Sequence, residues 1–384
     1  MLKPCLCFLN WCDGMKKQIV LIISIFLVIF CFIGCTEDTS EDNDTADGDS
    51  NSNNNDNNDD DGGGSDNANH EPVTLYVDDD GSVEYDNIID AVANSLDGDT
   101  IYVYNGIYDG EITVDKSITI VGEDKTMAIV DGTLTGGAHL SGGDNGFIIT
   151  ANDVSISGFN IQNSENDVSG VAIKISGAEN VTIFDNIINN TAEGVSIEVE
   201  KYGFSVSDSN DRSKYNMIRD NEITTNDEYC ISIDKYSNYN TIKNNVITQG
   251  IGSIEIGSDG NIVFGNTMSL SSSHGIKILS RANDNIIYKN SIFNCDQKGL
   301  SVSGDNNYIY LNNIYDNSLD TNFEDNVYSS GDNTWYNESL MKGNYYGDFY
   351  TGTDSDGDGI GDSSYEIPGG EDMDLYPLTE MVNI

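Results

Sequence analysis

One six-residue phrase, apolar-x-x-Asn-x-apolar, recurs through the middle of the chain and restricts how this chain can fold. Residues 183–188 (IFDNII), 218–223 (IRDNEI) and 242–247 (IKNNVI) are three of its copies. The Asn of successive copies stands at positions 221, 245, 266, 290 and 312, so the steps are 24, 21, 24 and 22 residues. A unit of this length cannot bury its apolar face alone, whereas stacked units share a continuous core. The repeat therefore predicts a solenoid.

A second phrase, Gly followed by alternating apolar residues, lies between the Asn positions, as in 170–175, 275–278 and 299–302. Alternation with a period of two, rich in β-branched residues, indicates short strands with one buried face. No sustained three-to-four spacing supports helical or leucine-rich repeats. Two or three short strands per turn describe a parallel β-helix of about ten coils. We expect the Asn to tolerate left-handed backbone at the corners and to stack into a ladder of side-chain amides.

The same segments resemble the NosD-like right-handed parallel β-helix proteins of the pectin-lyase-like superfamily. The resemblance rests on residues 89–92 (IDAV), 98–103 (GDTIYV) and 114–122 (VDKSITIVG), together with the Asn repeats, and covers roughly 73–378. It implies an all-β, right-handed parallel β-helix with a short N-terminal capping helix. Because this scaffold carries lyases, hydrolases, epimerases and non-enzymes alike, the resemblance does not fix a function.

A helix is expected within residues 86–96. Ile88, Ile89, Val92 and Leu96 share one face at helical spacing, and the Asp-Gly pair at 97–98 is expected to end the helix. The resemblance implies that this helix closes the N-terminal end of the solenoid, where uncovered strands would expose unpaired edges. We assign 72–342 to the β-helix and 343–384 to a C-terminal cap.

The chain is strongly acidic, with 65 acidic and 17 basic residues and a formal net charge of −48. This balance disfavours nucleic acids as partners, since they are bound by positive charge on the protein. It suits a well-hydrated surface or extracellular protein, which we expect to be a monomer.

The N-terminus has the pattern of an export signal. Lys16 and Lys17 precede an apolar run over 19–33, and a small residue stands before Cys35. We assign 1–35 to a signal peptide whose end resembles a lipobox, with Cys35 as the lipidated residue. The alternative is an uncleaved membrane anchor, although the run is short against the roughly 20 residues that a span needs. Both place the rest of the chain outside the cytoplasm and at the membrane.

Residues 36–71 are almost wholly Asp, Glu, Asn, Ser, Thr and Gly. Such a segment buries no apolar surface and repels itself, so we expect a disordered acidic linker. Further along, Cys230 and Cys295 lie about three coils apart, beyond the reach of a disulfide. We expect two buried thiols.

The outward positions of the Gly-apolar strands should stack into one exposed sheet face, which is the first candidate site. We select six polar residues on or beside it as candidates for binding a glycan: Lys174, Glu198, Asp234, Glu255, His274 and Lys277. On adjacent coils, Glu255 and Lys277 are expected to pair across the sheet. In polysaccharide lyases of the superfamily such a face holds calcium through carboxylates and a basic residue abstracts a proton, which implies an alternative, catalytic use.

His274 lies in a stretch, 273–278 (SHGIKI), that is similar to a strand of polygalacturonases. The Asn-Thr-Asp and Arg-Ile-Lys motifs of those enzymes are missing here. A glycoside hydrolase also needs two carboxylates flanking the sugar bond. We therefore reject the hydrolase and interpret His274 as a polar residue of the face.

A second candidate site lies in residues 354–362 (DSDGDGIGD). Asp354, Asp356, Asp358 and Asp362 supply carboxylates at alternate positions, with Gly where the loop turns, as in calcium-binding loops. Position twelve of an EF-hand would be Glu and here is Tyr365, so the loop looks more like those of thrombospondin type 3 or dockerin repeats. We expect structural calcium that clamps the last coil; an acidic turn without metal is the alternative.

The resemblance to NosD also implies a link to copper-site maturation, which the sequence does not support. Three scattered His residues and no Cys pair at ligand spacing leave no soft donor set for copper. We predict an exported, membrane-anchored, non-catalytic module that binds a polysaccharide or cell-envelope glycan. The alternative is a polysaccharide lyase or epimerase acting on an acidic glycan along the exposed strand face.

Overall fold

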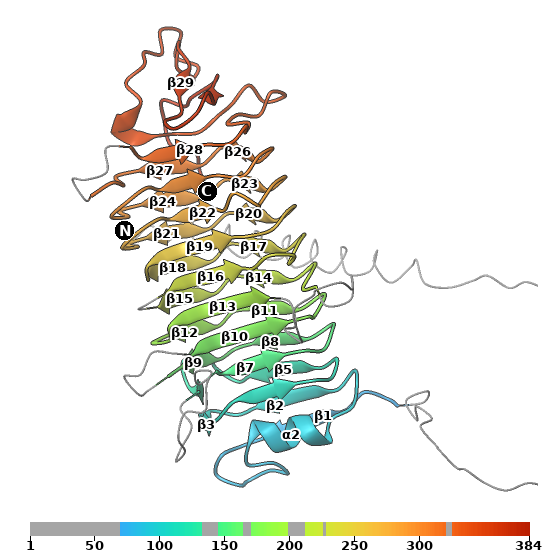
Figure 1. The fold of residues 1–384 in the computed structure, drawn as a ribbon. Coiled ribbons are helices and arrows are strands. Elements are labelled where there is room, and N and C mark those ends of the chain that lie inside the picture. The colour runs from blue at the N-terminus through green and yellow to red at the C-terminus, as the bar shows by residue number, and fades with distance from the viewer. Residues whose placement is uncertain (1–69, 133–144, 164–169, 199–211, 226–227, 320–324) are drawn as a thin grey trace, which may run out of the picture. The chain divides into compact units, whose positions relative to one another are not determined.

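The computed structural model of the chain describes residues 70–132, 145–163, 170–198, 212–225, 228–319 and 325–384. These residues belong to one compact unit, Ser65–Ile384, and Figure 1 shows its short strands stacked coil upon coil. The predicted signal peptide, Cys35 and nearly all of the acidic linker lie outside the described residues. Among the described residues, no helix is long and apolar enough to cross a membrane.

Three parallel sheets run along this unit, and each coil contributes one strand to each sheet. In the described residues, sheet A has ten strands and sheets B and C have nine each. This architecture confirms the predicted all-β parallel β-helix. Sheet A consists of β1 (Thr74–Val77), β2 (Thr100–Val103), β5 (Thr119–Gly122), β8 (Ser155–Ser157), β11 (Thr182–Phe184), β14 (Met217–Arg219), β17 (Thr241–Lys243), β20 (Ile262–Phe264), β23 (Ile286–Tyr288) and β26 (Tyr308–Tyr310).

Sheets B and C complete each coil. Sheet B consists of β3 (Gly106–Asp109), β6 (Ala128–Asp131), β9 (Asn160–Gln162), β12 (Ile187–Asn189), β15 (Glu222–Thr225), β18 (Val246–Gln249), β21 (Thr267–Ser269), β24 (Ser291–Phe293) and β27 (Asn313–Tyr315). Sheet C consists of β4 (Ile112–Val114), β7 (Phe147–Ile149), β10 (Val171–Ser176), β13 (Glu193–Glu198), β16 (Tyr229–Ile233), β19 (Gly252–Ile256), β22 (Ile276–Ile278), β25 (Leu300–Val302) and β28 (Val327–Ser329).

The core runs along the axis of the stack. The three-residue strands of sheets A and B mostly contribute their central residue to it, whereas those of sheet C contribute the two residues on either side of the centre. On sheet A, Ile218, Ile242 and Val263 are in register and fully buried, while the residues on either side of each are partly exposed. Burying a branched aliphatic side chain stabilises the fold by about 2 kcal/mol. Repetition over the coils explains why three-residue strands suffice.

The recurring Asn is buried at the corner between sheets A and B and forms the expected amide ladder. Its members are Asn186, Asn221, Asn245, Asn266, Asn290, Asn312 and Asn344. Asn266 is typical: its Nδ2 donates to Oδ1 of Asn290 at 3.0 Å and to the Ile242 carbonyl at 3.0 Å. The ladder therefore satisfies corner carbonyls that water cannot reach.

The backbone expectation for these Asn was wrong. For the six ladder Asn from 186 to 312, the left-handed residue is the one before the Asn: Asp185, Asp220, Asn244, Gly265, Lys289 and Leu311 all have positive φ. That Leu and Lys occupy this position shows that the coil geometry, and not the residue's own preference, imposes the conformation. The Asn are held by their hydrogen bonds.

A second amide ladder, which the sequence interpretation missed, follows the corner between sheets C and A. It consists of Asn216, Asn240, Asn261, Asn285, Asn307 and Asn333. Nδ2 of Asn285 donates to Oδ1 of Asn307 at 2.9 Å, and Asn307 donates to Asn333 at 3.0 Å. The signal was present, because an Asn precedes each of the recurring Asn at 221, 245, 266, 290 and 312 by five residues.

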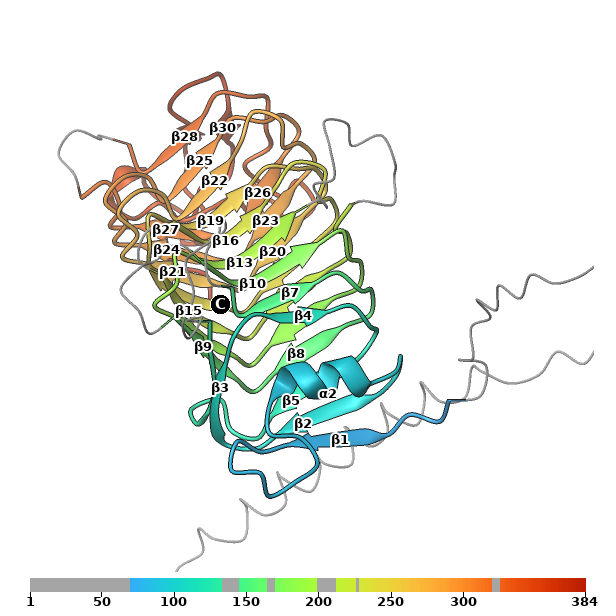
Figure 2. The same ribbon diagram turned by 60° about the horizontal axis from the view of Figure 1, so that its bottom comes forward.

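Helix α2 (Ile88–Asn94) covers the N-terminal end beside β1 and β2 (Figure 2). Asn87 caps it by accepting the backbone N–H of Asp90 at 2.7 Å. The predicted apolar face was only partly right, because Ile88 and Val92 are buried but Ile89 and Leu96 are 45% and 42% exposed. The helix ends at Asn94, before the expected Asp-Gly stop.

That early end has a local cause at Ser95. Its backbone N–H and Oγ both donate to the Val92 carbonyl, at 3.3 and 2.8 Å, in an extended conformation that does not continue the helix. Elsewhere in the unit, Cys230 and Cys295 are buried thiols as expected.

The C-terminal segment contains η2 (Gly347–Phe349) and an antiparallel pair, β29 (Tyr365–Glu366) and β30 (Met373–Asp374). Two buried carboxylates at β30 end the two amide ladders. Asp374 accepts the backbone N–H of Asn344 at 2.8 Å, and Asp372 accepts that of Asn333 at 3.1 Å. Both ladders point their donors toward this end, where the two carboxyl groups accept the last hydrogen bond of each ladder.

Candidate ligand-binding face

Sheet C presents a continuous outward row of mostly polar side chains. Successive partners in register are Lys174, Ser196, Ser232, Glu255, Lys277, Ser301 and Tyr328. Three of the six candidate binding residues, Lys174, Glu255 and Lys277, lie in this row. Glu198 does not, because its partner in the register is Ser176, and Ser196 takes the position that the sequence pattern assigned to Glu198.

A second outward row runs beside the first and was not anticipated. Val171 pairs with Glu193, and Tyr229 pairs with Gly252. In β16 two consecutive residues, Cys230 and Ile231, are buried, so the simple alternation breaks and Tyr229 and Ser232 both face outward.

Charges on and beside the face are paired with opposite charges. Lys174 lies 2.8 Å from Glu198, and Lys277 lies 3.1 Å from Glu255, which is the pair that the sequence predicts. Asp234, which follows β16, lies 3.7 Å from Arg281. Each pair joins residues of different coils, and among the described residues each of these cations is paired with a single carboxylate. Such alternation suits recognition of a polar chain better than a metal-assisted catalytic centre.

The Tyr229 ring covers Gly252, its neighbour in the register. A Cβ on Gly252 would lie 2.1 Å from Cε1 of Tyr229, so any other residue would displace the ring. Nζ of Lys277 lies 5.7 Å from the centre of this ring. Burial alone would lower the pKa of Lys277, but its hydrogen bonds to Glu255 and Tyr229 outweigh burial and raise it. The ring and the ammonium group thus form a fixed pair on the face.

Glu193 lies one coil before Tyr229 in the second outward row and is partly buried. Burial raises its pKa to about 7, against the opposing effect of a hydrogen bond from Ser232. The Ser232 hydroxyl in turn contacts that of Ser196 at 3.4 Å. Near neutral pH this carboxyl group therefore exchanges a proton easily, a property of general acids and bases as well as of buried structural groups.

His274 lies just before β22 and is partly buried. Burial lowers its pKa to about 4, and the positive charges of Lys277 and Lys298 act in the same direction. Nδ1 of His274 is 2.6 Å from Oγ of Ser273. At neutral pH the imidazole is therefore uncharged, and it can donate or accept a hydrogen bond at the face.

The acidic loop brings three of its four candidate ligands together. Carboxylate oxygens of Asp354, Asp356 and Asp358 lie within 4.8 Å of one another. Asp362 instead accepts hydrogen bonds from the hydroxyls of Thr353 and Ser355, at 2.8 and 2.6 Å. The oxygen-only donor set fits a hard cation such as calcium.

Soft donors for copper are not assembled in the described residues. His70 is bonded to Asp99 at 2.6 Å, and His274 lies far along the chain from it. The only described cluster of three or more His, Cys, Asp or Glu side chains that is suited to a metal is the Asp354 group. Carboxylate oxygens prefer hard cations to copper, so these residues do not fit a copper site.

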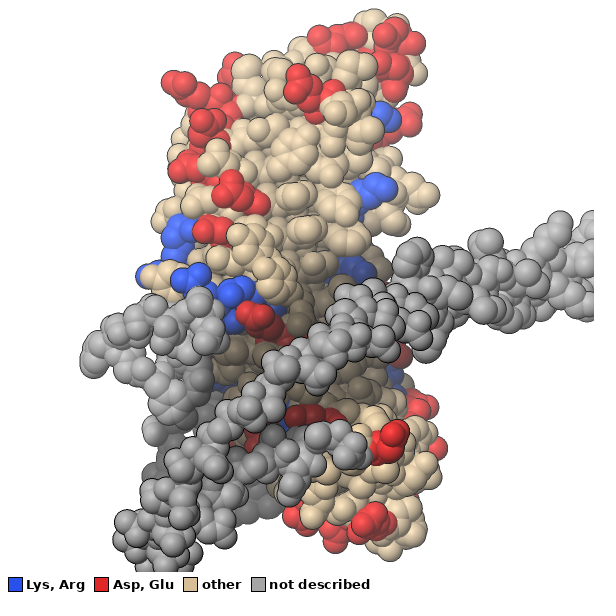
Figure 3. Space-filling model, turned by 90° about the vertical axis from the view of Figure 1, so that its right-hand side faces the viewer, with Lys and Arg blue, Asp and Glu red and all other residues tan. Residues whose placement is uncertain are grey.

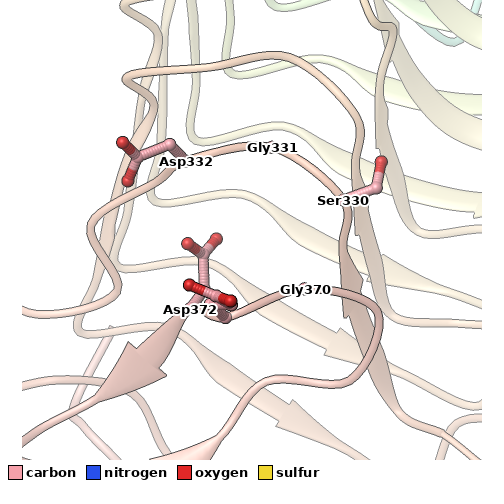
Figure 4. Close-up of a pocket in the computed structure, with 6 residues that line it drawn as sticks. Ser330, Gly331, Asp332, Gly370 and Asp372 are labelled. Carbon is pink, nitrogen blue, oxygen red and sulfur yellow. The ribbon is translucent and has the colours of Figure 1, made fainter.

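A hollow of about 510 Å³ lies between residues 330–332 and 370–372 near the C-terminal end. Figure 4 shows Ser330, Gly331 and Asp332 on one segment and Gly370 and Asp372 on the other. The Asp372 carboxylate is already bound by Oγ of Ser329 at 2.6 Å and Nε1 of Trp335 at 3.2 Å. Its role here is to hold the cap, which leaves sheet C as the stronger candidate.

Comparisons with known proteins agree with the fold. A family model described as "Periplasmic copper-binding protein (NosD)" matches residues 92–352. No curated protein matches the chain. A Geobacillus virus E2 protein, ORF18, is similar with a TM-score of 0.54 and 14% identity, over 77% of this chain and 68% of that one. This likeness supports the parallel β-helix alone.

Two enzymes are among the other similar structures. A carrot pectin methylesterase has a TM-score of 0.45 at 14% identity, over 70% of this chain and 85% of that one. An alginate lyase from Paenibacillus has a TM-score of 0.44 at 17% identity, over 72% and 98%. Such distant similarity carries no conclusion about activity.

Proposed function

Because the chain belongs to the NosD family of periplasmic proteins, we propose that it is an extracytoplasmic module that binds a glycan along the outer face of sheet C. Family membership indicates the extracytoplasmic location. The proposal adds attachment to the membrane at the cell surface through Cys35, and a ligand that is a polysaccharide or a glycan of the cell envelope.

One observation carries the proposal: the Tyr229 ring covers Gly252 on the outer face of the sheet, beside Lys277 and its partner Glu255. An aromatic ring offers a sugar an apolar surface, and the flanking charges offer hydrogen bonds at low cost because they are already fixed. The rows continue over many coils in one direction, which suits a chain of repeating sugars. The three ion pairs on and beside the face leave each cation next to a carboxylate, an arrangement that favours binding over catalysis.

The test is a glycan-binding screen of the purified full chain, followed by titration of the best ligand. Tyr229→Ala and Lys277→Gln are expected to weaken binding roughly tenfold each, since each removes an anchoring contact. Lys289→Gln is the matched control, because Lys289 is an exposed cation outside sheet C. Binding that survives both face variants, or that Lys289→Gln weakens equally, would refute the proposal.

A second candidate, a lyase or epimerase for an acidic glycan, is favoured by Glu193 and Tyr229. Glu193 has a pKa of about 7 and lies beside Ser232 on the same face, which suits a group that takes up or releases a proton. Incubation with a panel of polyuronates should then yield unsaturated ends or altered sugar configuration, and Glu193→Gln should abolish it. If the protein changes no polyuronate, the lyase or epimerase function is excluded and glycan binding remains the proposed function.

For the acidic loop we propose structural calcium held by Asp354, Asp356 and Asp358. Supporting this, the three carboxylates are already gathered, partly because Asp354 accepts the backbone N–H groups of Gly357 and Gly359 at 2.7 and 3.0 Å. Calcium should raise the thermal midpoint of the wild type but not of Asp356→Asn. If calcium raised the thermal midpoints of both proteins equally, the proposed calcium site would be refuted.

A further inference from the structure

Coils of unequal length leave a pocket at the corner between sheets C and A. The connecting loops 234–240 and 279–285 have seven residues, whereas loop 257–261 between them has five. This difference explains most of the uneven steps in the sequence repeat. The longer loops flank the shorter one around a hollow of about 90 Å³, lined by Lys235, Tyr236, Asp259 and Arg281 among others. That volume corresponds to about three water molecules, enough for one small charged group.

Arg281 is placed across the pocket by the shorter loop. Its Nε donates to the Gly257 carbonyl at 2.9 Å, and Nη2 lies 3.7 Å from Asp234. A Cβ on residue 257 would lie 2.8 Å from Nη2 and 2.9 Å from the Ile233 carbonyl, so Gly257 makes room for the guanidinium. With its side chain 46% exposed, Arg281 keeps donors available for a ligand.

Tyr236 forms the wall on the other side. It has a φ of 73° although it does not precede an Asn of either ladder, and such a conformation is unfavourable for a bulky residue. Its ring lies 4.3 Å from Nζ of Lys235 and 5.6 Å from Cζ of Arg212. Within the described part of the chain, the buried Nε of Arg212 has no hydrogen-bond partner.

The charge at this corner opposes that of the whole molecule. The chain has 17 basic and 65 acidic residues, yet two cations, Lys235 and Arg281, line the pocket, and a third, Arg212, lies 5.6 Å from the ring of Tyr236. Of the nearby carboxylates, Asp234 pairs with Arg281, and Asp259 accepts the backbone N–H of Asn283 at 2.8 Å. Figure 3 shows basic side chains grouped near mid-height, whereas acidic ones dominate the two ends.

We propose that the corner pocket formed by Lys235, Tyr236, Gly257 and Arg281 binds the anionic group of an acidic glycan. A guanidinium fork matches a carboxylate, sulfate or phosphate group with two parallel hydrogen bonds, and the lysine adds a point charge. The Tyr236 ring offers a surface for the sugar that bears the group. The inference rests on the proposed function for its glycan, but it assigns a separate site and the class of ligand.

The experiment measures affinity of the full chain for four soluble polymers. Polygalacturonate, dextran sulfate and a poly(ribitol phosphate) carry the three anionic groups, and unmodified dextran is neutral. At least one polyanion should bind, more weakly as salt rises, while dextran should not show this salt dependence. Comparing the three polyanions identifies which group the pocket accepts.

The variants separate the pocket from general charge. Lys235→Gln and Arg281→Gln should each weaken binding of the selected polyanion about tenfold, the expected effect of losing a charge-assisted hydrogen bond. The affinity of Arg281→Lys should lie between those of the wild type and Arg281→Gln. Lys235 is exposed, so its replacement leaves the fold intact. Lys289→Gln changes the net charge equally, lies away from the pocket and should change affinity less than twofold.

The outcomes distinguish this inference from the proposed function. If Lys235→Gln and Arg281→Gln leave affinity unchanged while Tyr229→Ala and Lys277→Gln reduce it, the pocket is refuted and the face stands. If the pocket variants lose binding and the face variants do not, the corner pocket is supported as the binding site and binding along the outer face of sheet C is refuted. Equal loss in Lys289→Gln, or no binding of any polyanion, overturns the pocket.

Discussion

At the scale of single residues, the buried amides decide whether the coil corners are stable. Asn266 accepts from the backbone N–H and Nδ2 of Asn245, at 2.9 and 3.0 Å, and donates to Asn290 and to the Ile242 carbonyl. No other side chain of this size both donates and accepts in this way. In a position with no exposed surface, its partners would find no water to replace it.

Asn266→Ala should therefore lower the free energy of unfolding by about 3 kcal/mol, since it leaves several buried groups without partners. Denaturation in urea measures this loss. Asn383→Ala, at an exposed position near the C-terminus, should change stability by less than about 0.5 kcal/mol. Similar stabilities for the two variants would contradict the role assigned to the ladder.

At the scale of structural elements, the C-terminal cap is tied to the coils by carboxylates that end the ladders. Asp374 is fully buried, where it accepts from Asn344 and from the hydroxyl of Tyr346, at 2.8 and 2.9 Å. A Cβ on Gly343 would lie 1.9 Å from this carboxylate, so the close approach needs glycine. The cap thus covers the last coil through β30 as α2 covers the first.

This burial makes the stability of the cap depend on pH. Burial raises the pKa of Asp374 from 3.8 to about 6, against hydrogen bonds that favour the charged form. The folded state therefore binds the proton of Asp374 more tightly than the unfolded chain does. The contribution of this proton binding to stability is greatest below pH 4 and falls as the pH rises to about 6.

Asp374→Asn removes this dependence. The difference in unfolding free energy between variant and wild type should change by roughly 2 kcal/mol between pH 4 and pH 7 in favour of the variant. Glu371→Gln changes an exposed neighbour, and its unfolding free energy should depend on pH in the same way as that of the wild type. A difference for Asp374→Asn that stays constant with pH would contradict the buried, proton-binding carboxyl group.

At the scale of the whole molecule, the repeat predicts the fold because each coil repeats the same three strands. The site was harder to predict because register and loop length decide it. Glu198 follows the outward pattern but aligns with Ser176, and Tyr229 faces outward only because two consecutive residues of β16 are buried. The uneven steps of the repeat contain the signal for the corner pocket, but which cations meet there depends on how neighbouring loops stack.

The central claim, that the outer face of sheet C binds the glycan, is tested most directly by hydroxyl-radical footprinting of the full chain with and without the ligand selected by the screen. Tyr229 and His274 on the face should be protected, whereas Tyr288 and Tyr310, which stack on each other at 5.4 Å on sheet A, should not change. Protection of the sheet A tyrosines with no change at Tyr229 would contradict the account.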